Sequence, residues 1–157
     1  MAKVKAIPDG YHSVTAYLCV NGAAEAIDFY QRAFGAIEVF RMQEPGGKVG
    51  HAEVEIGGTR IMLADEYPDW GFRAPAAYGG TPVMLHLYVE DVDAVYTRAV
   101  AAGAKPVRPV IDQFYGDRSG TIEDPFGHVW HVATHKEELT PDQIRERAVS
   151  AAPGSQG

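Results

Sequence analysis

The stretch VTAYLCVNGAAEAIDFYQRAFGA, residues 14–36, decides the fold. Residues 14–20 alternate between two faces, which is the period of a strand with one face covered. The remainder predicts a helix, with Asn21 as its N-cap and Gly35 at the left-handed position after its last turn. The apolar side chains of this helix recur at helical spacing: Ala23, Ala26, Ile27, Tyr30 and Phe34. A strand followed at once by an amphipathic helix therefore opens the domain.

The rest of the chain extends this unit and then repeats it. Three strands are expected at 37–43, 50–56 and 59–65. The second half predicts a strand at 83–89, a helix capped by Asp91 and stopped by Gly103, and strands near 106–110, 116–122 and 128–134. The pair Leu18-x-Val20 recurs as Leu87-x-Val89, an offset of 69 residues, which indicates a duplicated module. We expect an α+β fold of two tandem βαβββ modules that form a cupped mixed sheet.

The same pattern sets the domain boundaries. We expect an N-terminal arm at 1–11, one domain at 12–135, a C-terminal helix at 136–149 and a disordered tail at 150–157. Within the domain, module 1 covers about 12–66 and module 2 about 81–135. The linker 66–80 is rich in Pro, Gly and aromatic residues, and we expect Trp70, Phe72 and Tyr78 to order it over the mouth of the cup or over a dimer seam.

Composition narrows the function. The chain has 157 residues, 46% of them hydrophobic, and a formal net charge of −7 without a basic run. Nucleic acid and anionic membranes are therefore poor partners, and a neutral or cationic small molecule is easier to accommodate. Cys19 is the single cysteine, and no apolar run approaches membrane-spanning length. We expect a cytoplasmic protein without a disulfide, and no phosphate-binding loop, dinucleotide fingerprint or nucleophile elbow appears.

Several motifs carry a family resemblance. AIDFYQRAFGA (26–36) lies on the first helix, EDPFGHVW (123–130) precedes the last strand, and GHAEVEIGG (50–58) and LHLYVEDVDAV (85–95) lie between them. With the duplicated βαβββ order, they resemble the vicinal oxygen chelate (VOC) superfamily of glyoxalase I, bleomycin-resistance proteins, extradiol dioxygenases and fosfomycin-resistance enzymes. The resemblance covers roughly residues 12–135 and implies a cup that holds a divalent metal.

The family's metal positions transfer one by one onto this chain. They fall on Thr15, Ala64 or a neighbour, Met84 and His131, and of these only His131 is a good metal ligand. The four-ligand metal site of glyoxalase I is therefore not expected at these four positions.

Strand alternation gives a second set of candidates on the faces turned away from the helices. His51, His86 and His131 are candidate ligands for zinc, iron, manganese or nickel, and Glu53 is the candidate catalytic base. The candidate substrate-binding residues are Tyr17, Met84, Tyr88, Tyr115 and Arg118.

Simpler roles remain open for these residues. His51 and Glu53 can be a hydrogen-bonded pair, and His86 a buried histidine bonded to Tyr17 or Glu53. Arg118 can pair with Asp117 instead of a ligand.

Two classes of function follow. The first is a metal-dependent glyoxalase-like lyase or isomerase, or a dioxygenase-type enzyme, and the inward histidines favour it slightly. The alternative is a metal-free bleomycin-resistance-like protein that sequesters a small aromatic or cationic compound. For either class we expect a homodimer, because the exposed sheet edges and apolar faces need cover.

Overall fold

A computed structural model describes residues 3–151, which form two compact units divided between Gly79 and Gly80. Unit 1 precedes this boundary and unit 2 follows it. Each contains one four-stranded sheet, with strand orders β1-β4-β3-β2 and β5-β8-β7-β6. The first pair in each order is parallel and the other two are antiparallel. The predicted α+β class and the two tandem βαβββ modules are confirmed.

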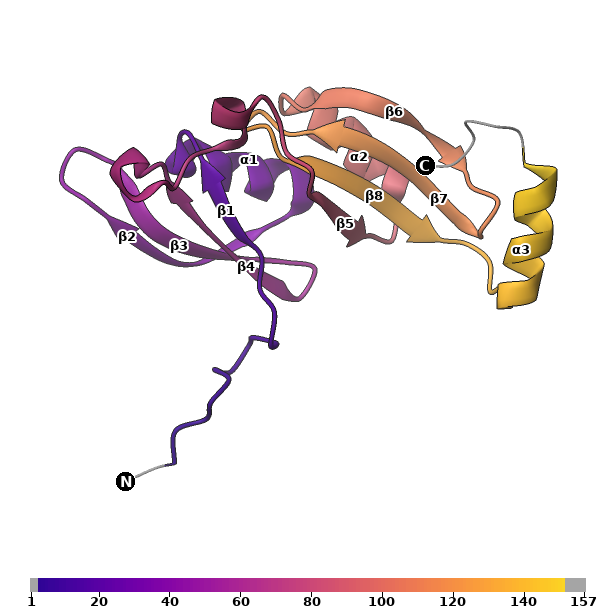
Figure 1. Cartoon of the computed structure of the whole chain (residues 1–157), viewed down its shortest axis with the longest axis horizontal. Coiled ribbons are helices and arrows are strands. Elements are labelled where there is room, and N and C mark those ends of the chain that lie inside the picture. The colour runs from indigo at the N-terminus through magenta and orange to yellow at the C-terminus, as the bar shows by residue number, and fades with distance from the viewer. Residues whose placement is uncertain (1–2, 152–157) are drawn as a thin grey trace. The chain divides into compact units, whose positions relative to one another are not determined.

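Unit 1 contains four strands and one α-helix (Figure 1). They are β1 (Tyr17–Val20), α1 (Ala23–Phe34), β2 (Ile37–Gln43), β3 (Val49–Ile56) and β4 (Thr59–Asp65). The apolar face of α1 buries seven side chains, among them Phe29 and Tyr30. On the strands, the alternate residues Ala52, Val54 and Leu63 are fully buried, so α1 and one face of the sheet form the core.

Unit 2 repeats this arrangement. Its elements are β5 (Met84–Tyr88), α2 (Val92–Ala101), β6 (Lys105–Asp112), β7 (Asp117–Glu123), β8 (Val129–His135) and α3 (Pro141–Ser150). Ile122, Trp130 and Val132 are buried on the α2 side of the sheet. Gly120 allows this close packing, because a Cβ there would lie 2.9 Å from the Tyr96 ring.

The first strand is shorter than predicted. β1 begins at Tyr17 instead of Val14, and Val14 is 90% exposed. The parallel pairing with β4 begins at Tyr17 and Met62. Within the part of the chain that the structure describes, only the Ala16 carbonyl among the alternating residues before Tyr17 bonds to β4, accepting from the Met62 N–H at 3.0 Å.

The predicted cap of α1 is wrong. The N-cap is Gly22, without a side-chain cap of its own, and the carboxylate of Asp65 accepts from the backbone N–H groups of Gly22 and Ala23 at 2.9 and 2.8 Å. Thr134 holds the same place in unit 2, accepting from the N–H of Val92 at 2.9 Å. Asp65 and Thr134 are 69 residues apart, as are Ala23 and Val92. A residue near the end of the last strand therefore binds the start of the helix in both modules. In unit 2 it supplements the predicted Asp91 cap, which is confirmed because the Asp91 carboxylate accepts from the Ala94 N–H at 3.1 Å.

The segment after β4 folds back within unit 1. It forms two short 3-10 helices, η1 (Pro68–Trp70) and η2 (Pro75–Tyr78), and Tyr67 bridges Phe72 through backbone hydrogen bonds of 2.8 and 3.1 Å. Trp70 and Tyr78 nevertheless keep exposed fractions of 81% and 66%.

The C-terminal helix α3 lies beyond the ends of β7 and β8 (Figure 1). The helix begins at Pro141, later than the expected residue 136, and Thr140 and Gln143 form a capping box at its start, with bonds of 3.2 and 2.9 Å. Arg147 ties the helix to Glu137. Of the expected tail 150–157, Ser150 is the last residue of α3, and residues 152–157 lie outside the described part of the chain. None of the helices within residues 3–151 is long and apolar enough to cross a bilayer.

Candidate functional site

Corresponding rows of side chains cross the two sheets on the faces turned away from α1 and α2. In unit 1 the strand register aligns Tyr17, Met62, Glu53 and Phe40, which we call the first row. In unit 2 it aligns His86, His131, Thr121 and Arg108, which we call the second row. The two rows occupy equivalent strands of the duplicated module but differ in chemistry.

A hydrogen-bond chain in unit 1 brings together three predicted site residues. Tyr17 Oη lies 2.7 Å from His51 Nδ1, and His51 Nε2 lies 3.2 Å from Glu53 Oε2. Because a carboxylate only accepts, this places the imidazole proton on Nε2 and leaves Nδ1 to accept from Tyr17. Tyr11, which the sequence did not single out, donates to the other oxygen of Glu53. The paired arrangement left open for His51 and Glu53 is thus formed.

A pocket of ≈ 510 Å³ opens on the same face of unit 1. Its lining residues come from the strands and from the segment after β4: Tyr17, Met42, Glu44, Gly50, Ala64, Tyr67, Trp70 and Phe72. Phe72 packs edge-on against Tyr17, with ring centroids 5.7 Å apart. The segment containing η1 therefore forms one wall of the pocket and the sheet forms the other.

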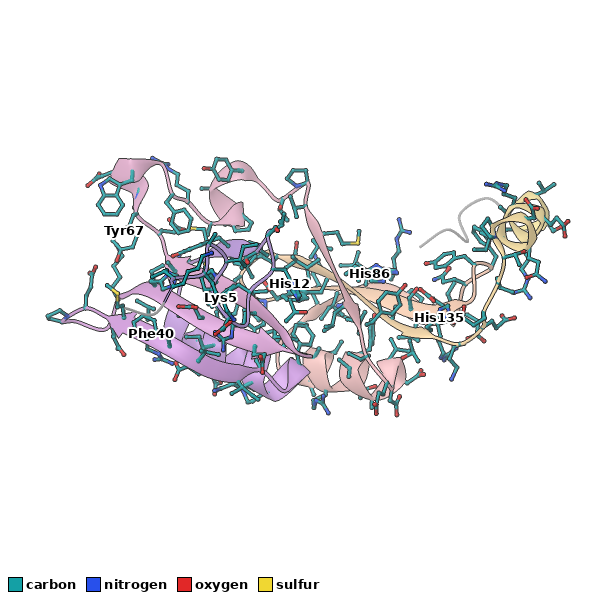
Figure 2. All side chains as sticks on the ribbon, turned by 90° about the horizontal axis from the view of Figure 1, so that it is seen from below. Lys5, His12, Phe40, Tyr67, His86 and His135 are labelled. Atoms are coloured by element: carbon teal, nitrogen blue, oxygen red, sulfur yellow. The ribbon has the colours of Figure 1, made fainter. Side chains whose placement is uncertain are left out.

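Three side chains hold Tyr67, which is labelled in Figure 2. Its ring stacks on Trp70 at 5.1 Å, and Lys48 Nζ lies 3.9 Å from its centroid. Its hydroxyl donates to Glu44 at 2.6 Å, and this bond is the main cause that raises the pKa of Tyr67 to about 12. Tyr67 is therefore a neutral, immobilised aromatic wall that already attracts one cation.

Gly50 keeps the pocket open. Its backbone does not need the left-handed conformation, but a Cβ there would lie 3.1 Å from Tyr67 Oη and 3.5 Å from Glu44. Glycine therefore suits this position because a side chain would crowd the pocket, and not because the backbone conformation requires glycine.

Cys19 has no nucleophilic role in this arrangement. It is buried in β1, and burial is the first cause that raises the pKa of its thiol to about 11, followed by the charges of Glu66 and Asp65. Near neutral pH the sulfur is a thiol, consistent with a small apolar side chain.

The second row places two imidazoles side by side in unit 2. The rings of His86 and His131 are 5.0 Å apart, and His131 Nδ1 is 2.9 Å from Thr121 Oγ1. His131 is 4% exposed. Burial, then the charges of His86 and Arg108, lower its pKa below the ordinary range. His86 is exposed, so the interpretation that it is a buried histidine in need of a partner is wrong.

Other predicted residues of unit 2 lie around this row. Tyr88 donates to Asp117 Oδ2 at 2.8 Å, and this bond raises the Tyr88 pKa. His135 (labelled in Figure 2) lies 2.8 Å from Asp117 Oδ1. Met84 is exposed on the same face of β5, and Tyr115 lies in the turn between β6 and β7.

Arg118 points toward the helix side of its sheet. Its guanidinium pairs with Asp93 of α2 at 2.8 and 2.9 Å and with Asp112 at 3.2 Å. The alternative left open by the sequence was an ion pair between Arg118 and Asp117. Asp117 instead accepts a hydrogen bond from Tyr88 and pairs with His135.

The metal ligands expected from the sequence are divided between the units. His51 and Glu53 belong to unit 1, whereas His86 and His131 belong to unit 2. Over residues 3–151, no group of three or more His, Cys, Asp or Glu side chains is arranged to hold a metal ion. Each unit alone thus offers fewer protein ligands than a zinc or nonheme iron site uses.

Comparison with known proteins supports the fold and the family. The sequence profile of the Glyoxalase/Bleomycin resistance protein/Dioxygenase superfamily matches residues 10–132. An uncharacterized Mycobacterium tuberculosis protein, Rv0887c, is 44% identical over 148 residues, covering 92% of this chain and 84% of its own length. TioX from Micromonospora is 27% identical with a TM-score of 0.62, covering 82% of this chain and all (100%) of its own. The Arabidopsis thaliana protein At5g48480 is 28% identical with a TM-score of 0.64, covering 78% of this chain and 98% of its own.

Proposed function

Because the chain belongs to the Glyoxalase/Bleomycin resistance protein/Dioxygenase superfamily, we propose that it binds a small planar aromatic molecule in the pocket of unit 1. The observation that carries this proposal is the pocket wall. Five of its eight lining residues are Tyr, Trp, Phe or Met, and Gly50 leaves room between them. Ligand sites are typically concave and apolar, with few polar groups to fix orientation.

The charge of the pocket favours a cationic or neutral ligand. Glu44 is the one charged residue among the eight that line it. Tyr67 uses one of its carboxylate oxygens, and a carboxylate has further acceptor capacity for a ligand N–H. The position of Lys48 over the Tyr67 ring shows that this ring already interacts with a cation. The net charge of the chain, −7, also favours a cationic ligand over an anionic one.

A binding titration with 9-aminoacridine, a planar aromatic cation, tests the proposal. We expect saturable binding to the wild type that Trp70→Ala weakens about tenfold, because the stacking partner is lost. Tyr78→Ala is the matched control, since Tyr78 is an exposed aromatic of the same segment that does not line the pocket. Absence of binding, or equal affinity in the wild type and Trp70→Ala, would contradict the proposal.

A second candidate is the metal-dependent lyase, isomerase or dioxygenase expected from the sequence. The observation in its favour is the adjacent imidazole pair of His86 and His131. In this candidate His86 and His131 would hold a divalent metal, which would polarise adjacent substrate oxygens. His51 and Glu53 of unit 1, the third expected metal ligand and the expected base, form their own hydrogen-bonded pair, and Tyr11 also donates to Glu53. Metal analysis of protein purified without a His-tag decides: near-stoichiometric zinc, iron, manganese or nickel supports the enzyme, and its absence leaves the binding function.

In either candidate we propose a cytoplasmic homodimer. The edge strands β2 and β6 expose several apolar side chains, among them Ile37, Phe40 and Val107. Light scattering of the full chain at micromolar concentration tests this, and a monomeric mass would contradict it.

A further inference from the structure

We propose that the pocket of unit 1 selects planar aromatic ligands that carry N–H groups at two separate positions, such as aromatic diamines, with Tyr17 Oη as a second hydrogen-bond acceptor beside Glu44. This inference rests on the aromatic binding function proposed above and names its ligand class. It follows from the direction of the hydrogen bonds at the pocket wall, because each bond settles which atom is left to meet a ligand.

The proton of the Tyr17 hydroxyl is committed to His51. Burial, and then the nearby Cys19, raises the pKa of Tyr17, so the phenol keeps its proton near neutral pH. His51 Nε2 donates to Glu53 Oε2 at 3.2 Å, and His51 Nδ1 therefore accepts from Tyr17 Oη at 2.7 Å. The Tyr17 oxygen is left with lone pairs only, so toward the pocket it accepts a hydrogen bond and does not donate one.

Several contacts hold His51 in this orientation. Tyr11 donates to the second oxygen of Glu53, so both oxygens of that carboxylate have a partner. The His51 ring also packs near Tyr17 and Phe40, with ring centroids 5.5 and 6.2 Å away. A flipped imidazole would lose its bonds to both Tyr17 and Glu53. His51 is thus a positioning residue that acts through Tyr17, and Tyr17 is the residue that meets the ligand.

The carboxylate at the end of this chain strengthens Tyr17 as an acceptor. Hydrogen bonds in a chain polarise one another, and Tyr17 donates to an imidazole that itself donates to Glu53. The Tyr17 oxygen therefore carries more negative charge than that of an isolated phenol. A cationic N–H group of a ligand gains most from such an acceptor.

The other polar corner of the pocket also accepts. Tyr67 Oη donates to Glu44 Oε1 at 2.6 Å, so the Tyr67 oxygen and the Glu44 carboxylate both can only accept from a ligand. Trp70 supplies the remaining side-chain donor among the eight lining residues, and it is 81% exposed, so water can bond to its indole N–H. Ligand N–H groups satisfy this wall, whereas ligand carbonyl oxygens would meet acceptors and be left unpaired.

The two acceptors lie at different places on the wall. Tyr17 belongs to the edge strand β1, and Glu44 follows β2, the opposite edge strand of the sheet. The first cause that raises the pKa of Tyr67 is its hydrogen bond to Glu44, and Tyr17 is also close enough to Tyr67 to be among the causes. One ligand in the pocket can therefore approach both acceptors, with a separate N–H group for each.

The test compares two acridine cations that differ in their amino hydrogens. Proflavine carries two amino groups, and acridine orange carries dimethylamino groups in the same positions. Fluorescence titrations are made at about pH 8, where a histidine imidazole is ordinarily neutral. We expect the wild type to bind proflavine at least about fivefold more tightly than acridine orange. Tyr17→Phe should lower the proflavine affinity about fivefold and leave the acridine orange affinity unchanged, because one net hydrogen bond is lost.

Two further variants complete the test. Tyr78→Phe is the matched control, since Tyr78 does not line the pocket, and it should change neither affinity. His51→Leu releases the Tyr17 proton, so 9-fluorenone, a planar ligand whose carbonyl only accepts, should bind this variant about threefold more tightly than the wild type. A general loss of structure would weaken every ligand and would not produce this gain.

Three results would overturn the inference: equal wild-type affinities for proflavine and acridine orange, equal proflavine affinities in the wild type and Tyr17→Phe, or no gain for 9-fluorenone in a folded His51→Leu protein. The ligand comparison in the wild type needs no variant, so it decides even where Tyr17→Phe does not fold. Failure of the proposed function is a different result, namely no binding of 9-aminoacridine or no effect of Trp70→Ala on it.

Discussion

The two units share one strand order but differ in the chain that follows the last strand, which in unit 1 forms a wall of the pocket on the candidate face. In unit 1 the chain after β4 returns through η1, so that Tyr67 and Phe72 line the pocket. In unit 2 the chain after β8 continues to α3, and Tyr88 on the equivalent face is 57% exposed. The connections therefore differentiate two copies of the same sheet.

The capping of the two helices gives the largest expected effect. Asp65→Ala removes a carboxylate that accepts from three backbone N–H groups, those of Gly22, Ala23 and Val49. We expect a loss of about 3 kcal/mol in the free energy of unfolding. Thr134→Val removes only a neutral oxygen that supplements the Asp91 cap of α2 and should cost about 1 kcal/mol. Urea unfolding followed by circular dichroism measures both, and equal costs would contradict the assignment of a stronger cap to unit 1.

Filling the pocket should affect binding more than stability. Gly50→Val places its side chain toward Tyr67 Oη and Glu44, and we expect the affinity for 9-aminoacridine to fall at least about tenfold. The urea midpoint should change little, because the backbone of Gly50 suits any residue. Unchanged affinity in a folded Gly50→Val protein would show that the probe binds elsewhere.

These features divide into what local sequence predicts and what it does not. Alternation and the 69-residue repeat predicted both sheets, because strands such as β3 bury alternate residues and the second module repeats the pattern of the first. The cap of α1 was misassigned to Asn21 because the real cap, Asp65, lies more than forty residues away in sequence.

The candidate site shows the same division. Strand alternation predicted that Tyr17, His51 and Glu53 lie on one face of the sheet, and hydrogen bonds connect them there. It did not reveal Tyr11, whose contact with Glu53 depends on how the N-terminal arm docks. Arg108 could not be placed by alternation, because bulges in β6 shift the register on both sides of it. The structure shows that it lies opposite Thr121 in the second row.

A pH effect is expected from His135 of unit 2. Hydrogen bonding to Asp117, and then to Glu138, raises the pKa of His135 above its ordinary value of about 6.5. The stabilisation is therefore complete below about pH 6 and is lost as pH rises through the raised pKa. We expect the wild type to lose a little more thermal stability between pH 6 and 9 than His135→Gln does. Identical pH profiles would mean that the pair contributes nothing.

The smallest effect is expected from α3. Its helix contacts the rest of unit 2 through Arg147, which bonds to Glu137 and to the Phe114 carbonyl, and none of its residues is buried. Removing residues 140–157 should leave cooperative melting and the affinity for 9-aminoacridine unchanged. Arg147→Gln provides a milder version, and loss of cooperative melting in the truncated chain would show that α3 belongs to the core.

A crystal structure of the chain with 9-aminoacridine bound would test the central claim most directly. The account predicts the acridine ring in the pocket of unit 1, between the Tyr17–Phe72 side and the Tyr67–Trp70 side, with its amino group toward Glu44. An empty pocket with the ring bound elsewhere at saturating concentration would contradict it.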